Sequence, residues 1–439
     1  NKKNGFIALV SPYVWWFIKS YEELRNYILN HLTFYNLIQL EYNAFEGATI
    51  PVGTFVLKNK IIPNYKMIGI KLSDFKGIEN QPIKTLEAIK NLNCSWRFQA
   101  KQKDFEKIPG SPIAYWVSDK VREIFEKNQK LGEVGEAKQG LATADNNRFL
   151  RLWNEVSFTK IGYNMSNSQE ALESKKKWFS YNKGGEFRKW YGNQEYLVNW
   201  ENDGDEIKKN ILQKYSYLKT PDFVVKNQSY YFKESISWSK VSSTNFSMRF
   251  YQKGFIFADA GMSYFSNENL KYILGLSNSK LINKILSLLS PTLNFEVGHI
   301  SNIPIVTKEN GLIENLVKEN ISISKEEWDS RETSWDFERL SLIDGKDLKT
   351  AYENYCSHWR DNFVQLHKNE EELNRLFIEI YELQDEMDEK VSFDDITILK
   401  KEAKIVEIDN SKAKEFSSES EKYLYDRGVS LEFNKDELV

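Results

Sequence analysis

The sequence predicts an α/β portion at its N-terminus, an α+β region in the middle and a helical region at its C-terminus. Residues 6–10 (Phe-Ile-Ala-Leu-Val) form a continuous apolar run of the kind found in fully buried strands. Residues 95–305 are rich in aromatic, lysine and asparagine residues, with short irregular apolar stretches. Residues 346–383 carry apolar side chains at spacings of three, four and seven among charged ones, which indicates a long amphipathic helix.

The first 60 residues alternate strand and helix signals. Pro12 ends the apolar run, and Ser20 is expected to cap a helix whose first turn contains Glu22. Strand-like stretches follow at 34–42 and 54–57. The order strand, helix, strand, loop, strand is expected for the closing portion of an α/β sheet rather than for a complete domain.

The length of 439 residues predicts two or three domains. We expect boundaries that give domains at 1–94, 95–305 and 306–439. Within the middle region, residues 270–289 indicate two short helices hinged near 277–279. No internal repeat is evident.

The net charge of −3 conceals a strong asymmetry along the chain. Residues 1–94 contain 11 Lys and Arg against 7 Asp and Glu, and residues 95–305 contain 30 against 22. Residues 306–439 contain 19 against 34. A basic first two-thirds favours a polyanionic partner such as nucleic acid. The acidic last third is expected to be mainly a solvated exterior, including Glu370–Glu372 on the water-facing side of the long helix.

The basic residues of the middle region stand next to aromatic residues. Such pairs can neutralise phosphates and stack on unpaired bases, whereas Arg, Asn and Ser can read base edges. Each pair could equally be a surface lysine beside a core tryptophan. The region-wide excess of positive charge favours a DNA-binding face, for which the candidate residues are Arg148, Arg151, Lys175, Lys176, Lys177, Arg188, Lys189, Trp190, Tyr191, Ser243, Asn245 and Arg249.

Motifs that carry catalysis are missing from these 439 residues. There is no GxGxxG, P-loop, nucleophile elbow, HExxH or EF-hand loop. Ser11-Pro12-Tyr13 matches only part of the tetrapeptide of amino-methyltransferases and is more simply the end of a strand. Asp395 with Glu402-Ala-Lys404 imitates a metal-dependent nuclease motif and is more simply a solvated charged face. We therefore assign no catalytic residue.

The cysteines and histidines indicate neither disulfides nor metal sites. Cys94 and Cys356 lie far apart, which favours a reducing compartment, and the four histidines have no metal-ligand spacing. The apolar run of residues 5–18 is interrupted by Pro12 and leads into a charged helix pattern, so we expect neither a signal peptide nor a membrane span. We expect a cytoplasmic protein without a metal.

Several segments resemble one enzyme family in order and number. Residues 5–16, 21–29, 45–48 and 54–57 resemble the stretch that follows the catalytic tetrapeptide in gamma-class adenine N6 DNA methyltransferases. The remainder of the chain resembles the PglX methyltransferases of bacterial BREX phage-defence systems. This second resemblance rests on residues 140–151, 153–156, 187–192, 236–241, 291–304, 332–337 and 371–381.

The resemblance implies the C-terminal part of a Rossmann-like methyltransferase sheet, a DNA target-recognition domain and a helical C-terminal region. It implies a parent enzyme that uses S-adenosylmethionine to methylate adenine N6 in double-stranded DNA. The S-adenosylmethionine loop and the complete tetrapeptide are not in these residues, so we expect the chain alone to be inactive.

Two alternatives remain open at this point. The chain could be the recognition half of a single-chain type IIG restriction-modification enzyme, which an upstream nuclease domain would distinguish. It could also be a non-catalytic docking module that binds other BREX proteins through its acidic helical C-terminal region.

Overall fold

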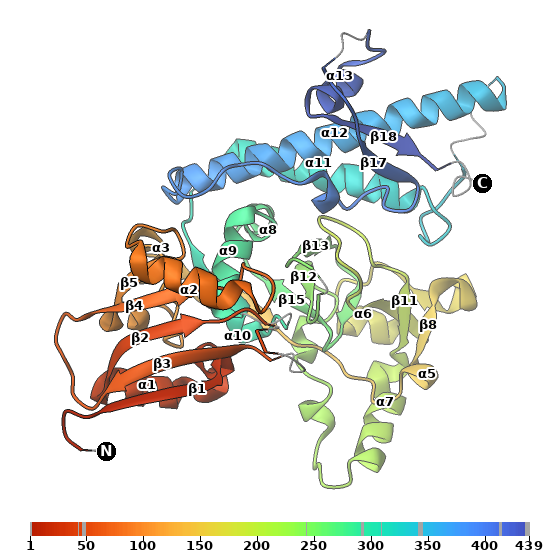
Figure 1. Cartoon of the computed structure of the whole chain (residues 1–439). Helices are drawn as coiled ribbons and strands as arrows, with labels where there is room; N and C mark the ends of the chain where they lie inside the picture. The colour runs from red at the N-terminus through yellow and green to blue at the C-terminus, as the bar shows by residue number, and fades with distance from the viewer. Residues whose placement is uncertain are drawn as a thin grey trace. The chain divides into compact units, whose positions relative to one another are not determined.

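The structure is a computed structural model that describes residues 2–42, 44–45, 50–242, 244–290, 294–308, 310–340, 346–411 and 415–434 (Figure 1). The chain divides into two compact units. Unit 1 comprises Asn1–Lys130, Lys284–Thr292 and Asn302–Val306. Unit 2 comprises Leu131–Asn283, Leu293–Ser301 and Thr307–Val439.

Unit 1 is built on a five-stranded sheet with the strand order β1-β3-β2-β4-β5. Neighbouring strands are antiparallel except β2 and β4, which are parallel. A two-stranded pair, β6 with β16, lies outside this sheet. The elements are β1 (Phe6–Pro12), α1 (Glu22–His31), β2 (Thr33–Gln39), β3 (Val52–Lys58), β4 (Lys66–Lys71), α2 (Asn80–Lys90), β5 (Arg97–Lys101), α3 (Asp119–Lys127), β6 (Gln129–Lys130) and β16 (Pro304–Ile305).

A buried arginine holds the loops around α1 in place. Arg25 is only 1% exposed, and its guanidinium donates hydrogen bonds to the carbonyls of Gly110, Trp15 and Ile18 at 2.6–2.9 Å. The hydrophobic core of unit 1 contains Trp16 and several other aromatic side chains. Because these carbonyls come from two segments distant in sequence, Arg25 joins the start of the chain to the loop that precedes α3.

Unit 2 contains two larger sheets, a small two-stranded antiparallel sheet and most of the described helices. The first sheet has the order β14-β10-β11-β8 with β9 beside β10, and the second has the order β13-β12-β15-β7. The elements of its sheet region are α4 (Leu131–Val134), β7 (Glu136–Lys138), α5 (Asn146–Phe149), β8 (Leu150–Leu152), β9 (Ile161–Gly162), α6 (Ser168–Glu173), β10 (Trp178–Asn182), β11 (Tyr196–Asn199), α7 (Glu201–Lys214), β12 (Ser235–Ser239), β13 (Met248–Tyr251), β14 (Phe255–Phe257), β15 (Gly261–Phe265), α8 (Leu270–Ser277) and α10 (Val297–Ser301).

Asn182 links the two sheets of unit 2. It ends β10, is 1% exposed, and its amide donates to the Ser237 hydroxyl on β12 at 2.5 Å and to the Gly261 carbonyl at the start of β15 at 3.2 Å. A buried side-chain amide that makes both of these hydrogen bonds favours one arrangement of the strands around it. The aromatic core of the first sheet packs behind it.

The helical part of unit 2 consists of two long helices, a short helix and an antiparallel pair of short strands. It contains α11 (Gly311–Asp329), α12 (Leu348–Ile380), β17 (Ala403–Glu407), α13 (Glu419–Asp426) and β18 (Val429–Phe433). α11 contacts both α12 and α8, and α11 and α12 lie side by side (Figure 1). The helix α9 (Lys280–Leu289) follows α8 after a short break and crosses from unit 2 into unit 1.

Most of the predicted elements are confirmed. The long helix predicted at 346–383 is α12, and the hinged pair predicted at 270–289 is α8 followed by α9. The strand at 6–10 and the two strands after it are β1, β2 and β3. Ser11 and Pro12 end β1, as expected, and Tyr13 begins a short 3-10 helix.

Two details of the N-terminal prediction are wrong. The N-cap of α1 is Tyr21 rather than Ser20, and no side chain caps this helix, because a short 3-10 turn at Lys19–Tyr21 leads directly into it. The strand at 6–10 is also not buried, since β1 is an edge strand whose residues Phe6, Leu9 and Val10 are 56%, 48% and 66% exposed.

Replacing Arg25 by alanine is expected to destabilise unit 1 by about 3 kcal/mol or more, because buried carbonyls lose charged hydrogen-bond donors. Urea unfolding, monitored by hydrogen exchange of the backbone amides of unit 1, measures this loss of stability. Asn26→Ala on the exposed side of the same helix is the matched control and is expected to change stability by less than about 0.5 kcal/mol. Equal effects of the two substitutions would contradict the role given to Arg25.

Candidate nucleic-acid interface

Ten of the twelve candidate DNA-binding residues form two groups in unit 2 that differ in exposure. Arg148, Arg151 and Lys175–Lys177 are exposed or half-buried and form what we call the basic patch. The other group is buried and bonded internally, and consists of Arg188, Lys189, Trp190, Tyr191 and Arg249. Only the first group presents charge to solvent.

The basic patch is assembled by the first sheet of unit 2. The side chain of Asp145 caps α5 by accepting a hydrogen bond from the Arg148 backbone N–H at 3.2 Å. The Arg148 guanidinium donates to the Glu206 carboxylate at 2.6 Å, and this hydrogen bond lowers the pKa of Glu206. Lys177 lies close enough to lower the same pKa further and pairs with Glu201 at 3.6 Å. The structure therefore brings Arg148 and Lys177 together from segments 29 positions apart in the printed sequence.

The remaining residues of the basic patch surround the start of β10. The guanidinium of Arg151 lies 5.4 Å from the centre of the Trp178 ring and donates to the carbonyls of Asn147 and Leu150. Lys176 donates to the Thr159 carbonyl, whereas Lys175 is exposed and has a left-handed backbone with φ 53°. Each cation in the patch retains solvent-facing surface, which contact with a phosphate requires.

Arg188 belongs instead to a buried ion-pair network. It is 8% exposed, and its guanidinium contacts the Glu327 carboxylate at 2.5 Å and donates to the Tyr191 carbonyl at 2.6 Å. Glu327, on α11, also pairs with Arg331, which reaches Glu402 at 2.8 Å. Burial acts to raise the pKa of Glu327, but the two guanidinium groups outweigh it and hold that pKa below its ordinary value.

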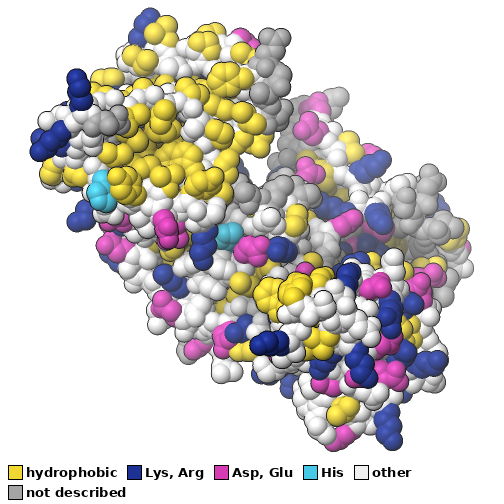
Figure 2. Space-filling model, turned by 90° about the horizontal axis from the view of Figure 1, so that it is seen from below, with side chains coloured by type: hydrophobic (Ala, Val, Ile, Leu, Met, Phe, Trp, Pro, Cys, Tyr) yellow, Lys and Arg dark blue, Asp and Glu magenta, His cyan; other side chains and the backbone are white. Residues whose placement is uncertain are grey.

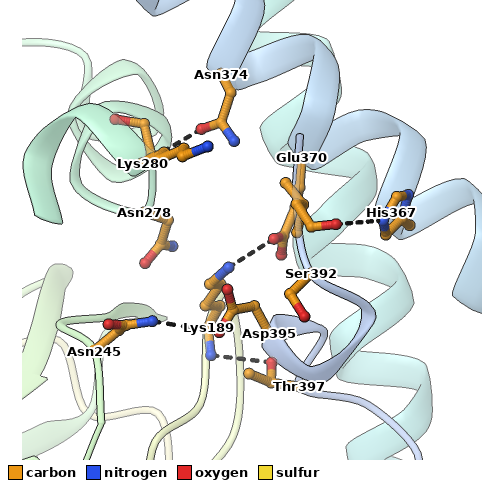
Figure 3. A network of polar contacts seen from close by, with 12 residues as sticks. Lys189, Asn245, Asn278, Lys280, His367, Glu370, Asn374, Ser392, Asp395 and Thr397 are labelled. Atoms are coloured by element: carbon orange, nitrogen blue, oxygen red, sulfur yellow. Dashed lines mark hydrogen bonds and ion pairs between the residues drawn. The ribbon is translucent and has the colours of Figure 1, made fainter. Parts of the chain in front are cut away.

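Lys189 and Trp190 share the carboxylate of Glu370 on α12, and Figure 3 shows the Lys189 side of this contact. The Lys189 ammonium lies 2.6 Å from one oxygen of Glu370, and the Trp190 indole N–H donates to the other oxygen at 2.8 Å. The Lys189 side chain is 7% exposed and that of Glu370 is 4% exposed. The Lys189 backbone N–H donates to the Thr397 hydroxyl at 3.1 Å. We call Lys189, Trp190, Glu370 and Thr397 the buried clamp.

The backbone of the clamp is held in an uncommon conformation. Trp190 has a left-handed backbone with φ 68°, which is unfavourable for a bulky side chain. Its N–H donates to the Met248 carbonyl at 3.1 Å, and its carbonyl accepts from Phe250 N–H at 2.7 Å, so β13 fixes it from one side. Gly192 follows with φ 126°, where a Cβ would collide with the Arg188 side chain.

Arg249 and Tyr191 complete the buried group. Arg249 is fully buried and donates to the Arg188 carbonyl at 3.2 Å and to the Ser239 hydroxyl at 3.1 Å. Burial raises the pKa of Tyr191 to about 12, so its phenol is neutral at physiological pH. In this conformation the buried side chains are not accessible to a ligand from solvent.

The polar loop predicted before β13 is only partly described. Asn245 donates to the Asp395 carboxylate at 3.3 Å, and Ser243 lies outside the described residues (Figure 3). Asn278, at the end of α8, both accepts from the Met248 N–H and donates to its carbonyl. The segment around β13 is therefore bonded to α8 on one side and to the clamp on the other.

Two expectations about acidic residues are corrected. Glu370 is not on a water-facing side of the long helix, because its carboxylate is enclosed by Lys189 and Trp190. Glu402 is not part of a solvated face either, because it is 8% exposed and bonded to Arg331. The sequence signal for Glu370 was its place between apolar residues Leu366 and Leu373, one helical turn away on either side.

The described residues contain neither a cluster suited to a metal ion nor a helix suited to a membrane. There, no group of three or more histidine, cysteine, aspartate or glutamate side chains is placed to hold a metal ion. No described helix is both long enough and apolar enough to cross a membrane.

The clamp predicts a non-additive double-mutant cycle. Lys189→Met leaves the Glu370 carboxylate buried without its cation, and Glu370→Gln leaves the ammonium without its anion, so each is expected to cost about 3–5 kcal/mol. The double variant is expected to lose less than the sum of the two, because it buries no unpaired charge. Urea unfolding measures all three.

The exposed pair Lys209 and Asp205 is the matched control for this cycle. Lys209→Met is expected to cost less than about 1 kcal/mol, since surface pairs contribute little. Additive effects of the Lys189 and Glu370 substitutions would show that the two residues do not act as a pair.

Comparison with known proteins finds relatives among methyltransferases. No protein-family model matches the chain. The chain is 35% identical over 411 residues to the adenine-specific methyltransferase PglX of Lacticaseibacillus casei (strain Zhang), covering 91% of this chain and 34% of PglX. It is 38% identical over 389 residues to the adenine-specific methyltransferase BrxX of Escherichia coli O9:H4 (strain HS), covering 86% of this chain and 30% of BrxX.

The fold has a counterpart among solved structures. It is similar, with a TM-score of 0.50, to the type IIL restriction-modification enzyme MmeI in complex with DNA, covering 87% of this chain and 48% of MmeI. At 11% identity this similarity concerns the fold alone. The chain spans about a third of the length of the two methyltransferases. It is thus related over about nine-tenths of its length to a part of the PglX-type adenine-specific methyltransferases, as its motifs predicted.

Proposed function

We propose that this chain is the DNA-recognition part of an S-adenosylmethionine-dependent, adenine-specific (N6) DNA methyltransferase of a bacterial BREX defence system. The observation that carries the proposal is the 35% identity to PglX over 91% of the chain. The fold shared with MmeI and the basic patch on unit 2 support it. In the proposed enzyme, this part holds the duplex so that one adenine can leave the base stack and reach the catalytic centre.

The proposed arrangement has three parts along the chain. Residues 1–94 would be the end of a Rossmann-like methyltransferase sheet, 95–305 the target-recognition domain and 306–439 a helical support. The buried clamp supports the last assignment, because it bonds α12 and Thr397 to the segment that contains Lys189. A support that is bonded to a recognition segment sets its position without touching DNA.

The exposures divide the candidate DNA-binding residues by role. We propose that the basic patch contacts phosphates, because its cations are exposed or half-buried. We propose that Arg188, Lys189, Trp190, Tyr191 and Arg249 position the neighbouring loops, because all five are less than 9% exposed. Asn245 is exposed at a loop and stays a candidate for base contact, as does Ser243. Arg148 and Lys177 would exchange their carboxylate partners for phosphates on binding.

The docking alternative has weaker support. It relied on an acidic exterior in the last third of the chain, but Glu327, Glu370 and Glu402 there are buried and paired with cations of the same unit. The restriction-enzyme alternative is compatible with the fold shared with MmeI and depends on residues outside this chain.

Neutralising the basic patch is expected to weaken DNA binding. The variant Lys175→Gln, Lys176→Gln, Lys177→Gln removes up to three phosphate contacts, so it should lower affinity for duplex DNA by about tenfold or more and reduce the slope of log affinity against log salt by about 1–3. Fluorescence anisotropy with a labelled duplex at several salt concentrations measures both quantities.

The matched control removes three exposed lysines from the helical region, as Lys318→Gln, Lys346→Gln, Lys349→Gln. It changes the net charge equally and is expected to leave affinity within about twofold, because those lysines lie outside the proposed interface. Equal losses in the two triple variants would contradict a defined interface, and unchanged affinity in the first would favour the docking alternative.

The chain alone is expected to transfer no methyl group. We propose that binding of S-adenosylmethionine and catalysis need residues outside these 439, because the chain spans a third of PglX and contains no glycine-rich nucleotide loop. Incubation with S-adenosylmethionine labelled in its methyl group and with duplex DNA tests this, with PglX of L. casei as the positive control. Labelled DNA from the chain alone would overturn this part of the proposal.

A further inference from the structure

The segment that follows α7 contains the two most exposed aromatic side chains among the described residues. Tyr217 is 76% exposed and Phe223 is 70% exposed. Single exposed apolar residues are common, but two large rings in one short segment are not accounted for by packing, because burial of either ring would stabilise unit 2. We call residues 215–223 the α7 tip.

The rest of unit 2 holds the α7 tip in place. Tyr215 and Leu218 pack against the core of the first sheet, and the Leu218 backbone N–H donates to the Tyr215 carbonyl at 2.9 Å. After the tip, the Val224 carbonyl accepts a hydrogen bond from the Ala142 N–H at 3.1 Å. Tyr217 is therefore exposed on a supported turn, between residues that do reach the core.

The α7 tip extends beyond the sheets of unit 2. In Figure 1, α7 and the segment after it project away from both of these sheets. Figure 2 views the molecule from below, so this projection faces the viewer, and apolar side chains there lie among charged ones. An element that extends beyond its own domain can enter a groove of a duplex.

Three lysines with no carboxylate partner among the described residues surround the α7 tip. Lys219 lies within it and is exposed, Lys214 precedes it and Lys226 follows it. The Lys226 ammonium donates to the side-chain carbonyl of Gln139 at 2.8 Å and lies 5.4 Å from the centre of the Phe223 ring. The positive charge of these side chains is therefore not neutralised by the described part of the chain.

The helix α7 joins the tip to the basic patch. Arg148 of the patch donates to Glu206 at 2.6 Å and to Asn210 at 3.3 Å, both on α7. Lys214, one turn after Asn210, donates to the Ala144 carbonyl at 2.6 Å, in the loop that leads to Arg148. Because a helix rises about 1.5 Å per residue, Asn210 and Lys214 are about 6 Å apart along the helix axis. A DNA strand bound at Arg148 can therefore extend to the α7 tip.

The chemistry of the α7 tip matches an unpaired nucleotide. A base stacks on an aromatic ring, and lysine neutralises the phosphate beside it. An apolar protein surface would have no use for the three lysines. Residues 214–226 contain only one acidic residue, Asp222, so the charge of this segment favours a polyanion. An adenine that leaves the base stack exposes the faces of its former neighbours.

We propose that Tyr217 and Phe223 stack on base faces that become exposed where the duplex opens at the target adenine. The rings stabilise the opened duplex, while the basic patch holds the flanking phosphates. This inference rests on the proposed function and names a DNA contact of a different kind. Stacking tolerates any base, because every base has an aromatic face, so the α7 tip contributes to opening rather than to sequence choice.

The test compares two labelled DNAs, each with the full 439-residue chain. One is a fully paired duplex. The other is the same duplex with a short run of mismatched base pairs at its centre, which exposes base faces without the help of a catalytic domain. Fluorescence anisotropy at several salt concentrations measures both affinities. We expect the mismatched duplex to bind more tightly.

Substitutions identify the rings. Tyr217→Ala and Phe223→Ala are each expected to weaken binding of the mismatched duplex by about fivefold or more, and binding of the paired duplex by a smaller factor. The slope of log affinity against log salt should stay the same, because stacking releases no counterions. Tyr217→Phe keeps a ring and is expected to bind as the unsubstituted chain does. Tyr217→Leu keeps an apolar side chain without a ring and is expected to bind as weakly as Tyr217→Ala.

The matched control is Leu348→Ala in the helical part of unit 2. It removes an apolar side chain that is 74% exposed, and both affinities are expected to be unchanged. Circular dichroism verifies the fold of each variant.

Three outcomes would overturn the inference. The first is that both alanine variants of the tip bind the mismatched duplex as tightly as the unsubstituted chain. The second is that Tyr217→Leu binds as tightly as Tyr217→Phe, which would indicate an apolar contact instead of stacking. The third is a dimer of the chain, seen by sedimentation, that Tyr217→Ala dissociates, since a second copy would then cover the tip.

The proposed function can fail or stand separately from this inference. If the alanine variants of the tip bind normally while the triple variant of Lys175–Lys177 loses affinity, DNA binding stands and only the stacking role is wrong. If the unsubstituted chain binds neither DNA, the proposed function itself is contradicted, and the inference fails with it.

Discussion

A buried ion pair between Lys189 and Glu370 governs the arrangement of unit 2. Neither charge could be buried at this depth without the other, because the loss of hydration of each ion costs several kcal/mol. The pair joins residues 181 positions apart, one beside the sheets and one on the longest helix. Trp190 adds an indole N–H to the same carboxylate and takes an unfavourable backbone conformation to do so. The position of this segment therefore depends on helices that come much later in the chain.

The regular elements could be predicted from the sequence because their signals are local. Apolar spacing along residues 346–383 is enough to indicate α12, and the polar break after Ser277 is enough to separate α8 from α9. The exposure of β1 was mispredicted because its sequence has the pattern of a central strand, whereas the described chain supplies a neighbour on one side only. An apolar pattern indicates that a strand can be buried between neighbours. Whether those neighbours are present depends on other segments of the polypeptide, which the pattern does not show.

The candidate site was harder to predict than the fold. The sequence gives the number of charged residues in a region, but not which of them are buried in ion pairs and which remain at the surface. Arg188 and Lys177 look alike there, each a cation beside aromatic residues, but Arg188 pairs with Glu327 inside the unit and Lys177 remains at the surface. Their partners lie 139 and 24 positions away, and no local pattern shows the first of these distances. The acidic last third of the chain was misjudged for the same reason, because Glu327 and Glu370 neutralise Arg188 and Lys189 of the middle region.

The buried clamp also limits how such proteins can exchange parts. A segment that contains Lys189 and Trp190, moved alone into a relative without a matching carboxylate, would bury an ammonium with no counterion. The reverse exchange would leave the buried Glu370 carboxylate without the Lys189 ammonium. Any recombination that alters what the loops of unit 2 recognise must therefore keep the two halves of the clamp together, either by carrying both segments or by breaking the chain outside 189–397. New specificities in such a scaffold are then expected to arise more readily from changes at exposed loop positions than from replacement of whole strands.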